Sequence, residues 1–249
     1  MKIKIHKEGY PVIILVFLLL VNACGKPAGK VIAKIPEASG IDYCSQDDTL
    51  IVANDEGTYY KINRKGKILQ KIKLGKHDLE GVVCEEKEIL FALENKGLLS
   101  INRKTGEKKI IDVDTLYNGK KLRLFDKKSG VEGIAKVDNI VYLAKQSDKK
   151  KKSFIAVVRL TPYPARIIDV IEHHVADTAG LTFDDGYLYM VSDKEDLLIK
   201  YDIAKKKSVL KVKLEEGAWE GIAFDNKGNV YLADDEGRVL KYKKKRLGL

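Results

Sequence analysis

Short stretches of alternating apolar and polar residues, bounded by Gly, Asn or Asp, follow one another along most of the chain. The clearest stretch is 219–225, which is apolar after a Glu-Gly opening. It is followed by the apolar run 230–233 and an acidic turn that ends at Gly237. Alternation over four to eight residues with turn residues between is typical of strands joined in hairpins. The pattern predicts an antiparallel strand pair here and a third strand over 238–242.

The same glycine-anchored opening recurs along the chain. These anchor glycines are Gly40, Gly81, Gly133, Gly180 and Gly221, separated by 41, 52, 47 and 41 residues. A period near 40 residues with four strands per unit is typical of propeller blades. Five repeats therefore predict an all-β, five-bladed β-propeller over residues 31–249. A β-sandwich could use the same strand pairs, but it does not explain the recurring opening.

The fifth repeat supplies only three strands before Leu249. An uncovered sheet edge invites aggregation, so a closed propeller needs a fourth strand for this blade. Residues 31–35 (Val-Ile-Ala-Lys-Ile) have a strand-like pattern and precede the first blade. We expect them to form the outer strand of the fifth blade.

Residues 1–24 have the pattern of a targeting segment: an early lysine cluster, the apolar run 12–21, then Ala23 and Cys24. The run is too short for a comfortable membrane span, and its end resembles a bacterial lipoprotein signal. We expect a signal peptide over 1–24 with a lipidated Cys24, then a tether over 25–30. The alternatives are an uncleaved anchor or a plain signal peptide with an incidental cysteine. Each places the rest of the chain at the extracytoplasmic face of a membrane in the bacterial cell envelope.

The chain carries a formal net charge of +10, which falls to +8 without the charged residues of 1–23. Such a charge favours anionic lipid or lipopolysaccharide surfaces, or simply solubility. The lysines are scattered and few aromatic residues lie among them, so no nucleic-acid partner is expected. The run 149–152 reads as a solvated loop, with membrane contact as the alternative.

Three cysteines are too few for a disulfide scaffold. Cys24 is accounted for by lipidation. Cys44 and Cys84 lie four and three residues after their anchor glycines, which would direct them to opposite faces. They could pair only if blades one and two bring them within reach, and we expect two small buried thiols.

Carboxylates gather in front of the anchor glycines. The positions one and three residues before each glycine are two apart, so on an extended chain their side chains point the same way. Every repeat has a carboxylate in at least one of them: Glu37, Asp78, Glu80, Glu132, Asp177 and Glu220. If these positions begin the innermost strands, the carboxylates ring one mouth of the central channel.

A second acidic set ends the following strands. It consists of Asp55, Glu94, Asp193 and Asp234, and antiparallel pairing would place it beside the first set. The alternative is that these residues are ordinary turn formers. Converging carboxylates are unfavourable unless a cation neutralises them or some are protonated. Oxygen ligands without a Cys or His pattern favour Ca²⁺, so both sets are candidate metal ligands.

The histidines form no constellation, although His77, His173 or His174 could act as a general base near a metal. In the segments around the anchor glycines, the chain resembles the SdiA-regulated, YjiK-like family of bacterial envelope proteins. The resemblance covers about 31–243 and rests on the segments 36–41, 78–81, 131–136, 177–181 and 219–225. It implies a five-bladed propeller, distantly similar to NHL repeats, with a calcium site, and it implies no established activity.

The first functional hypothesis is a calcium-binding module held at a membrane by Cys24, with an unknown small-molecule or protein ligand. We expect it to be a monomer. The alternative is a calcium-dependent hydrolase, lactonase-, esterase- or phytase-like, acting at the channel mouth. Lactonase-like chemistry would need a histidine there, and phytase-like chemistry several Lys or Arg. A third possibility is a scaffold whose acidic ring is only electrostatic.

Overall fold

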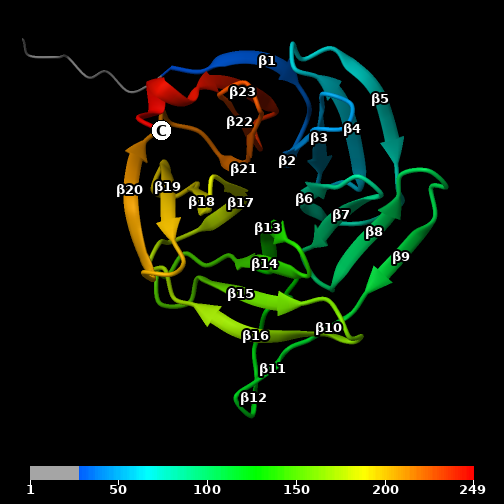
Figure 1. The fold of residues 1–249 in the computed structure, drawn as a ribbon, viewed down its shortest axis with the longest axis vertical. Helices are drawn as coiled ribbons and strands as arrows, with labels where there is room; N and C mark the ends of the chain where they lie inside the picture. Colours follow the sequence, from blue (N-terminus) through cyan, green and yellow to red (C-terminus); the bar gives the residue numbers. More distant parts are fainter. Residues whose placement is uncertain (1–27) are drawn as a thin grey trace, which may run out of the picture.

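The computed structural model describes residues 28–249, in which five sheets, each built on four antiparallel strands, surround a central channel (Figure 1). The predicted all-β, five-bladed propeller is confirmed. The only helix in the described residues is the short 3₁₀ element η1 (Lys244–Leu247). No helix of residues 28–249 is long and apolar enough to cross a membrane. The predicted signal segment and Cys24 lie outside the described residues.

Each blade is a meander whose first strand lies innermost, at the channel. Blade one contains β2 (Ala38–Cys44), β3 (Thr49–Asn54), β4 (Thr58–Asn63) and β5 (Ile68–Lys73). Blade two contains β6 (Leu79–Cys84), β7 (Glu88–Leu93), β8 (Leu98–Asn102) and β9 (Lys108–Ile111). Blade three contains β13 (Val131–Val137), β14 (Ile140–Lys145), β15 (Phe154–Arg159) and β16 (Ala165–Ile171). Blade four contains β17 (Thr178–Asp184), β18 (Tyr187–Ser192), β19 (Leu197–Asp202) and β20 (Lys207–Lys213).

Blade five is built from both ends of the described chain. Its strands are β21 (Trp219–Phe224), β22 (Asn229–Asp234), β23 (Arg238–Lys243) and β1 (Lys30–Lys34). As predicted, β1 is the outer strand, antiparallel to β23 (Figure 1). Just beyond β1, the Ile35 amide donates to the Gly237 carbonyl at 2.9 Å. Residues 30–243 thus supply every strand of the five blades, so the propeller is complete within the described residues.

An insertion separates blades two and three. Its strand β10 (Val113–Asp114) pairs in parallel with β16 and extends the blade-three sheet to five strands. Strands β11 (Leu116–Tyr117) and β12 (Lys120–Lys121) form a small hairpin beyond the rim (Figure 1). The insertion therefore widens one side of the disc.

The anchor glycines mark where neighbouring inner strands touch. A Cβ atom added at Gly81 would lie 2.5 Å from the Ile134 amide nitrogen of blade three. One added at Gly221 would lie 2.8 Å from the Ile41 amide nitrogen of blade one. Gly40, Gly133 and Gly180 likewise face the backbone of an adjacent inner strand. The repeat thus contains glycine because the strands approach one another too closely for any side chain.

Every blade also has a register shift at its anchor glycine, in the pairing of its first and second strands. In blade three, Val131 pairs with Lys145 and Gly133 with Ala144, so Glu132 has no partner. A bulge of this kind re-aims the side chain of the extra residue. Because of these bulges, the side chain of the residue before each anchor glycine does not follow the alternating orientation of its strand.

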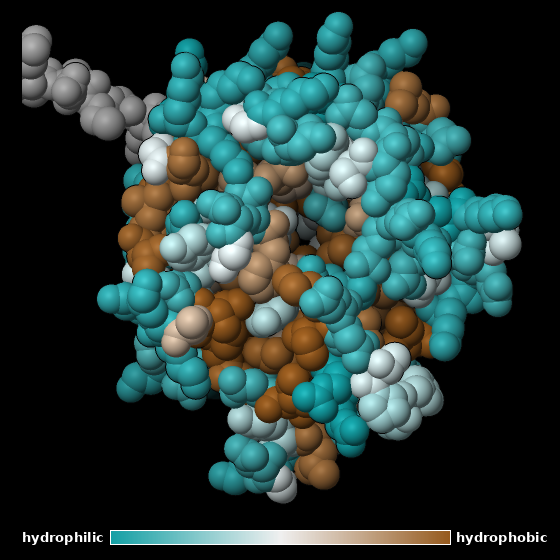
Figure 2. Space-filling model, in the orientation of Figure 1, coloured by the Kyte–Doolittle hydropathy of each residue, from teal (hydrophilic) through white to brown (hydrophobic). Residues whose placement is uncertain are grey.

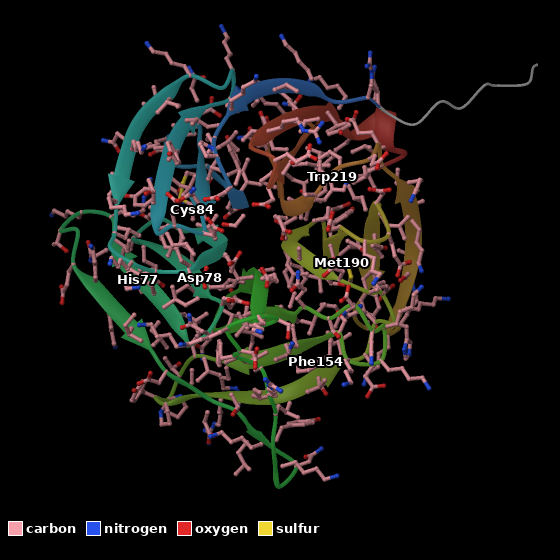
Figure 3. All side chains as sticks on the ribbon, turned by 180° about the vertical axis from the view of Figure 1, so that it is seen from behind. His77, Asp78, Cys84, Phe154, Met190 and Trp219 are labelled. Carbon is pink, nitrogen blue, oxygen red and sulfur yellow. A yellow bond between two sulfur atoms is a disulfide. The ribbon has the colours of Figure 1, made fainter. Side chains whose placement is uncertain are left out.

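Cys44 and Cys84 form a disulfide, with their Cα atoms 5.3 Å apart, so the expectation of two free thiols is wrong (Figure 3). The cysteines end β2 and β6 and lie in the apolar cluster between blades one and two, near Ile51 and Phe91. Consecutive blades stack face to face, so opposite faces of neighbouring blades meet. The opposite orientation that argued against pairing is the one that brings the two sulfur atoms together.

We predict that Gly133→Ala destabilises the protein by about 1–3 kcal/mol, because the new methyl group would collide with the Ala179 carbonyl of blade four. Chemical denaturation of residues 26–249 measures the free energy of unfolding. Gly119→Ala is the control, because that glycine has a positive φ of 74° but open space around its Cα. Gly133 does not have a positive φ, so its loss would come from the close approach alone, whereas any loss in Gly119→Ala would come from backbone strain. An unchanged free energy of unfolding in Gly133→Ala would contradict the prediction.

Candidate channel-mouth site

Three glutamates from three blades converge at one mouth of the channel. Glu80 and Glu132 are 7% and 8% exposed, and Glu220 is half-buried with an Oε2 atom that has no hydrogen-bond partner. Each occupies the bulged position before an anchor glycine. In blades one and four this position holds Ser39, whose hydroxyl donates to the Leu79 carbonyl at 2.5 Å, and Ala179. The inner ring therefore contains carboxylates from only three of the five blades.

Burial and mutual repulsion raise the pKa values of this inner ring. The pKa of Glu80 lies well above its usual range because of burial and then the charges of Glu132 and Glu220. Burial raises the pKa of Glu132 to about 7, although a hydrogen bond from Glu80 opposes the rise. Burial, then the charge of Glu132, also raises the pKa of Glu220. The raised pKa of Glu80 favours a protonated carboxyl group that donates a hydrogen bond to the Glu132 carboxylate.

A second group of carboxylates surrounds the inner ring, as the sequence predicted. The Glu94 amide donates to the Asp78 carbonyl, which confirms that the end of the second strand lies beside the start of the first. Burial, a hydrogen bond with Glu37 and that residue's charge raise the pKa of Asp55 to about 7. The pKa of Glu94 is raised mainly by burial, although the Gly130 amide donates to its Oε1 atom at 3.2 Å. Figure 3 shows Asp78 on the channel side of blade two.

Asp177 and Asp193 belong to the same group, on blade four. Burial raises the pKa of both, and each is close to a further aspartate, Asp148 for Asp177 and Asp177 for Asp193. Asp177 is buried and has a φ of 51°, a backbone conformation that non-glycine residues rarely adopt. The blade-four carboxylates thus extend the negative charge around the mouth.

In blade five the structure places Asp235, and not Asp234, in the position equivalent to Asp55 and Glu94. Asp234 pairs with Trp219 in the strand register, is fully buried and forms an ion pair with Arg238. The Asp235 amide donates to the Ala218 carbonyl, and its charge acts on both Asp55 and Glu220. Asp55 and Asp235 each precede their turn glycine, Gly57 or Gly237, by two residues, so this signal was already present in the sequence.

At the last position of its second strand, blade three has a lysine, whereas the other blades have Asn, Leu, Ser or Asp. Lys145 is buried at the end of β14, and its Nζ atom donates to the Ser129 carbonyl and hydroxyl and to the Gln146 carbonyl. Burial lowers its pKa, although the charges of Asp126 and Glu132 act in the opposite direction. Sequence reasoning overlooked this residue, which attaches the insertion to the mouth.

A hollow of about 830 Å³ adjoins Lys145 at the blade-three side of the mouth. It contains side chains of both signs, including Arg123, Lys128, Lys149, Lys151, Lys152, Asp126, Asp148 and Asp177. Basic residues are thus present at the same mouth as the carboxylates, which is the feature expected of a site for an anionic ligand.

The histidines are not hydrogen-bonded to either acidic set in the described residues. Burial, then the neighbouring His174, lowers the pKa of His173 to about 4, and its Nδ1 atom accepts a hydrogen bond from the Val175 amide at 3.2 Å. Burial also lowers the pKa of His77, whose Nδ1 atom has no partner. Neither histidine is positioned as a base acting with the glutamates.

Among residues 28–249 no group of three or more His, Cys, Asp or Glu side chains is already arranged around one metal position. The donor chemistry nevertheless suits a hard cation, because the candidate ligands at the mouth are carboxylate oxygens. Buried oxygen atoms of Glu220 and Asp55 lack hydrogen-bond partners. The residues therefore fit Ca²⁺ chemically, provided that the side chains close around it.

Comparison with known proteins identifies the family and the fold. The model of the family described as SdiA-regulated matches residues 26–238. No curated protein sequence matches the chain. Glutaminyl cyclase from Myxococcus xanthus has a similar structure, with a TM-score of 0.63 at 12% identity over 87% of this chain and 94% of that one. BamB from Moraxella catarrhalis is more distant, with a TM-score of 0.43 at 11% identity over 82% of this chain and 57% of that one.

We predict that the Glu132 carboxyl group makes the metal-free protein less stable as pH rises from about 4.5 to 7. The folded state keeps its proton up to a pKa of about 7, whereas the unfolded chain releases it near 4.5. The free energy of unfolding should therefore fall with pH by about 3 kcal/mol from this group. The measurement is thermal denaturation of residues 26–249 with a chelator, for wild type and Glu132→Gln.

The difference in unfolding free energy between wild type and Glu132→Gln isolates the glutamate. It is needed because buried His173, present in both proteins, makes each more stable as pH rises from about 4 to 6.5. Glu132→Gln should gain stability relative to wild type as pH rises. Glu216→Gln, an exposed residue with the same charge change, should follow wild type. A constant difference across this pH range would contradict the raised pKa.

Proposed function

Because the chain belongs to the SdiA-regulated family, we propose that it is an extracytoplasmic, membrane-anchored β-propeller that binds Ca²⁺ at its channel mouth and uses this site to bind a ligand. The observation that carries the proposal is the convergence of Glu80, Glu132 and Glu220 from three blades. Burying uncompensated carboxylates is strongly unfavourable. A site that retains them has a physical reason to bind a cation.

Glu132 and Glu220 would bind the cation from the inner ring, and Glu80 would join them on losing its proton. Asp55, Asp78 and Glu94 are within the surrounding group and would supply further oxygens or hydrogen-bond the first ligands. When bound, Ca²⁺ would neutralise the mouth and offer a coordination position to a ligand oxygen. The ligand itself is a small molecule or a protein of unknown identity.

The anchoring part of the proposal rests on the leader sequence and the lipoprotein-like Cys24. The Cys44–Cys84 disulfide supports an extracytoplasmic location, because structural disulfides persist in oxidising compartments. Both observations support the proposed location in the bacterial cell envelope, and Cys24 would provide the attachment to a membrane.

A second candidate function is catalysis at the same mouth. In the Glu80–Glu132 pair, the pKa of Glu80 is raised and that of Glu132 is about 7, which suits general acid–base chemistry at neutral pH. The structurally similar protein from M. xanthus is a glutaminyl cyclase. The lysines of blade three favour an anionic substrate over a neutral lactone. At 12% identity the likeness extends to the fold alone, so a binding module remains the first proposal.

We predict that Ca²⁺ raises the melting temperature of metal-stripped residues 26–249 and that Mg²⁺ does so much less. A ligand that binds only the native state stabilises it by about 2.7 kcal/mol at one hundred times its Kd. For a domain of this size, that corresponds to a shift of about 5–10 °C. Differential scanning fluorimetry at pH 7.5 over a Ca²⁺ series measures the shift.

Glu220→Gln should reduce the Ca²⁺-dependent shift even though its metal-free melting temperature rises, because the variant removes a carboxyl group whose ionisation is opposed by burial and by the charge of Glu132. Glu216→Gln is the matched control and should keep the full shift. If Ca²⁺ has no effect, or has the same effect on Glu220→Gln as on wild type, the channel mouth is not the calcium site.

For the second candidate, we predict turnover of a substrate within a panel of lactones, aryl esters, phosphate esters and peptides with N-terminal Gln. The panel is tested with and without Ca²⁺. Glu132→Ala should lose the turnover because it removes the proton acceptor for Glu80. The absence of turnover above this variant would exclude those reactions and leave binding as the function.

A further inference from the structure

The two ends of the propeller differ in the charged side chains that they expose. The carboxylate mouth lies where the inner strands begin. The turns between first and second strands and between third and fourth strands lie at the other end, here called the far end. In the sector of blades four, five and one, the far end has exposed basic side chains: Lys30, Lys65, Lys67, Lys206, Lys207, Lys243, Lys245 and Arg246. These far-end cations face away from the acidic mouth.

The far-end cations make no ion pair within residues 28–249, although acidic residues are present nearby. Other basic residues neutralise those acids: Arg64 with Asp48 and Asp225, Lys227 with Asp48, Lys244 with Asp184, and Lys205 with Asp202. Asp185 is the exposed acid that remains in this sector. The far-end cations are therefore available to an external anionic partner.

Exposed apolar side chains lie among these cations. Val31, Ile68, Leu69 and Val209 are 45%, 46%, 46% and 42% exposed, and each is within two residues of a far-end cation. The turn that carries Lys65 and Lys67 packs against β1, because Gly66 contacts the Ile32 carbonyl. Apolar side chains within a basic surface are typical of proteins that lie on a membrane interface. Figure 2 shows hydrophilic side chains projecting around the circumference, with apolar patches between them.

The chain also enters the propeller at this end. Strand β1 begins at Lys30, which pairs with Lys241 near the far-end terminus of β23. The strand then runs toward the mouth, where Lys34 pairs with Arg238 beside Asp234. Cys24 lies six residues before β1. A lipid on Cys24 would hold the far end close to the bilayer.

We infer that the far end is a docking surface for anionic phospholipid headgroups. The lysines bind the headgroup phosphates, and Val31, Ile68, Leu69 and Val209 contact the interfacial layer. This contact adds to the lipid anchor of the proposed function but requires neither lipidation nor Ca²⁺. It fixes the orientation of the propeller, with the carboxylate mouth turned away from the membrane and open to ligands.

The test uses residues 26–249, which contain the complete propeller and lack the anchor. We expect flotation with phosphatidylglycerol-rich vesicles at low salt, weaker binding at high salt, and little binding to phosphatidylcholine vesicles. The triple variant Lys206→Glu, Lys207→Glu, Lys245→Glu should lower the vesicle–water partition coefficient of the protein by about tenfold or more. Ile68→Ser with Leu69→Ser should weaken it without changing the net charge.

Matched controls separate the docking surface from net charge. Lys149→Glu, Lys151→Glu and Lys152→Glu make the same charge change at the mouth end and should leave vesicle binding nearly unchanged. Ile110→Ser is the apolar control on blade two. Equal loss in both charge-reversal triples, or equal binding to both lipids, would overturn the proposal. In the lipidated full chain on phosphatidylglycerol nanodiscs, amide exchange should be slowed at 203–207 and 243–247 but not at 193–196; the reverse pattern would also overturn it.

Discussion

The close approach of five inner strands around the channel axis is the constraint on which the rest of the structure depends. At Gly40, Gly81, Gly133, Gly180 and Gly221 the strands touch backbone to backbone, where a Cβ atom has no room. A register shift accompanies each contact and leaves the preceding residue outside the strand pairing. In three blades that residue is a glutamate. The geometry that closes the ring therefore also directs carboxylates into the channel.

The buried carboxylates oppose folding. Desolvation and mutual repulsion raise the pKa values of Glu80, Glu132 and Glu220, and no described basic side chain forms an ion pair with them. The apolar clusters between adjacent blades and the disulfide stabilise the ring in spite of this. Local features that weaken a fold while the surrounding structure compensates for them are typical of functional sites.

Charge also distinguishes the two ends of the disc. Loops at the mouth supply most of the carboxylates, whereas the far end of blades four, five and one exposes lysines and apolar side chains. Because β1 enters at the far end, an N-terminal anchor and a ligand at the mouth would lie on opposite sides of the propeller. The proposed ligand binding and membrane attachment would therefore not conflict sterically.

The sequence alone determined the blades, their number and the closure by residues 31–35, observed as 30–34, because strand alternation and a repeated glycine are local features of the chain. It also placed Glu80, Glu132 and Glu220 at one mouth. Only the tertiary structure decided the disulfide, because residue alternation does not show which faces of neighbouring blades meet. The same holds for the ion pair that draws Asp234 away from the acidic group, and for Lys145. Those positions depend on bulges and strand register, which are set by contacts between strands that are distant in sequence.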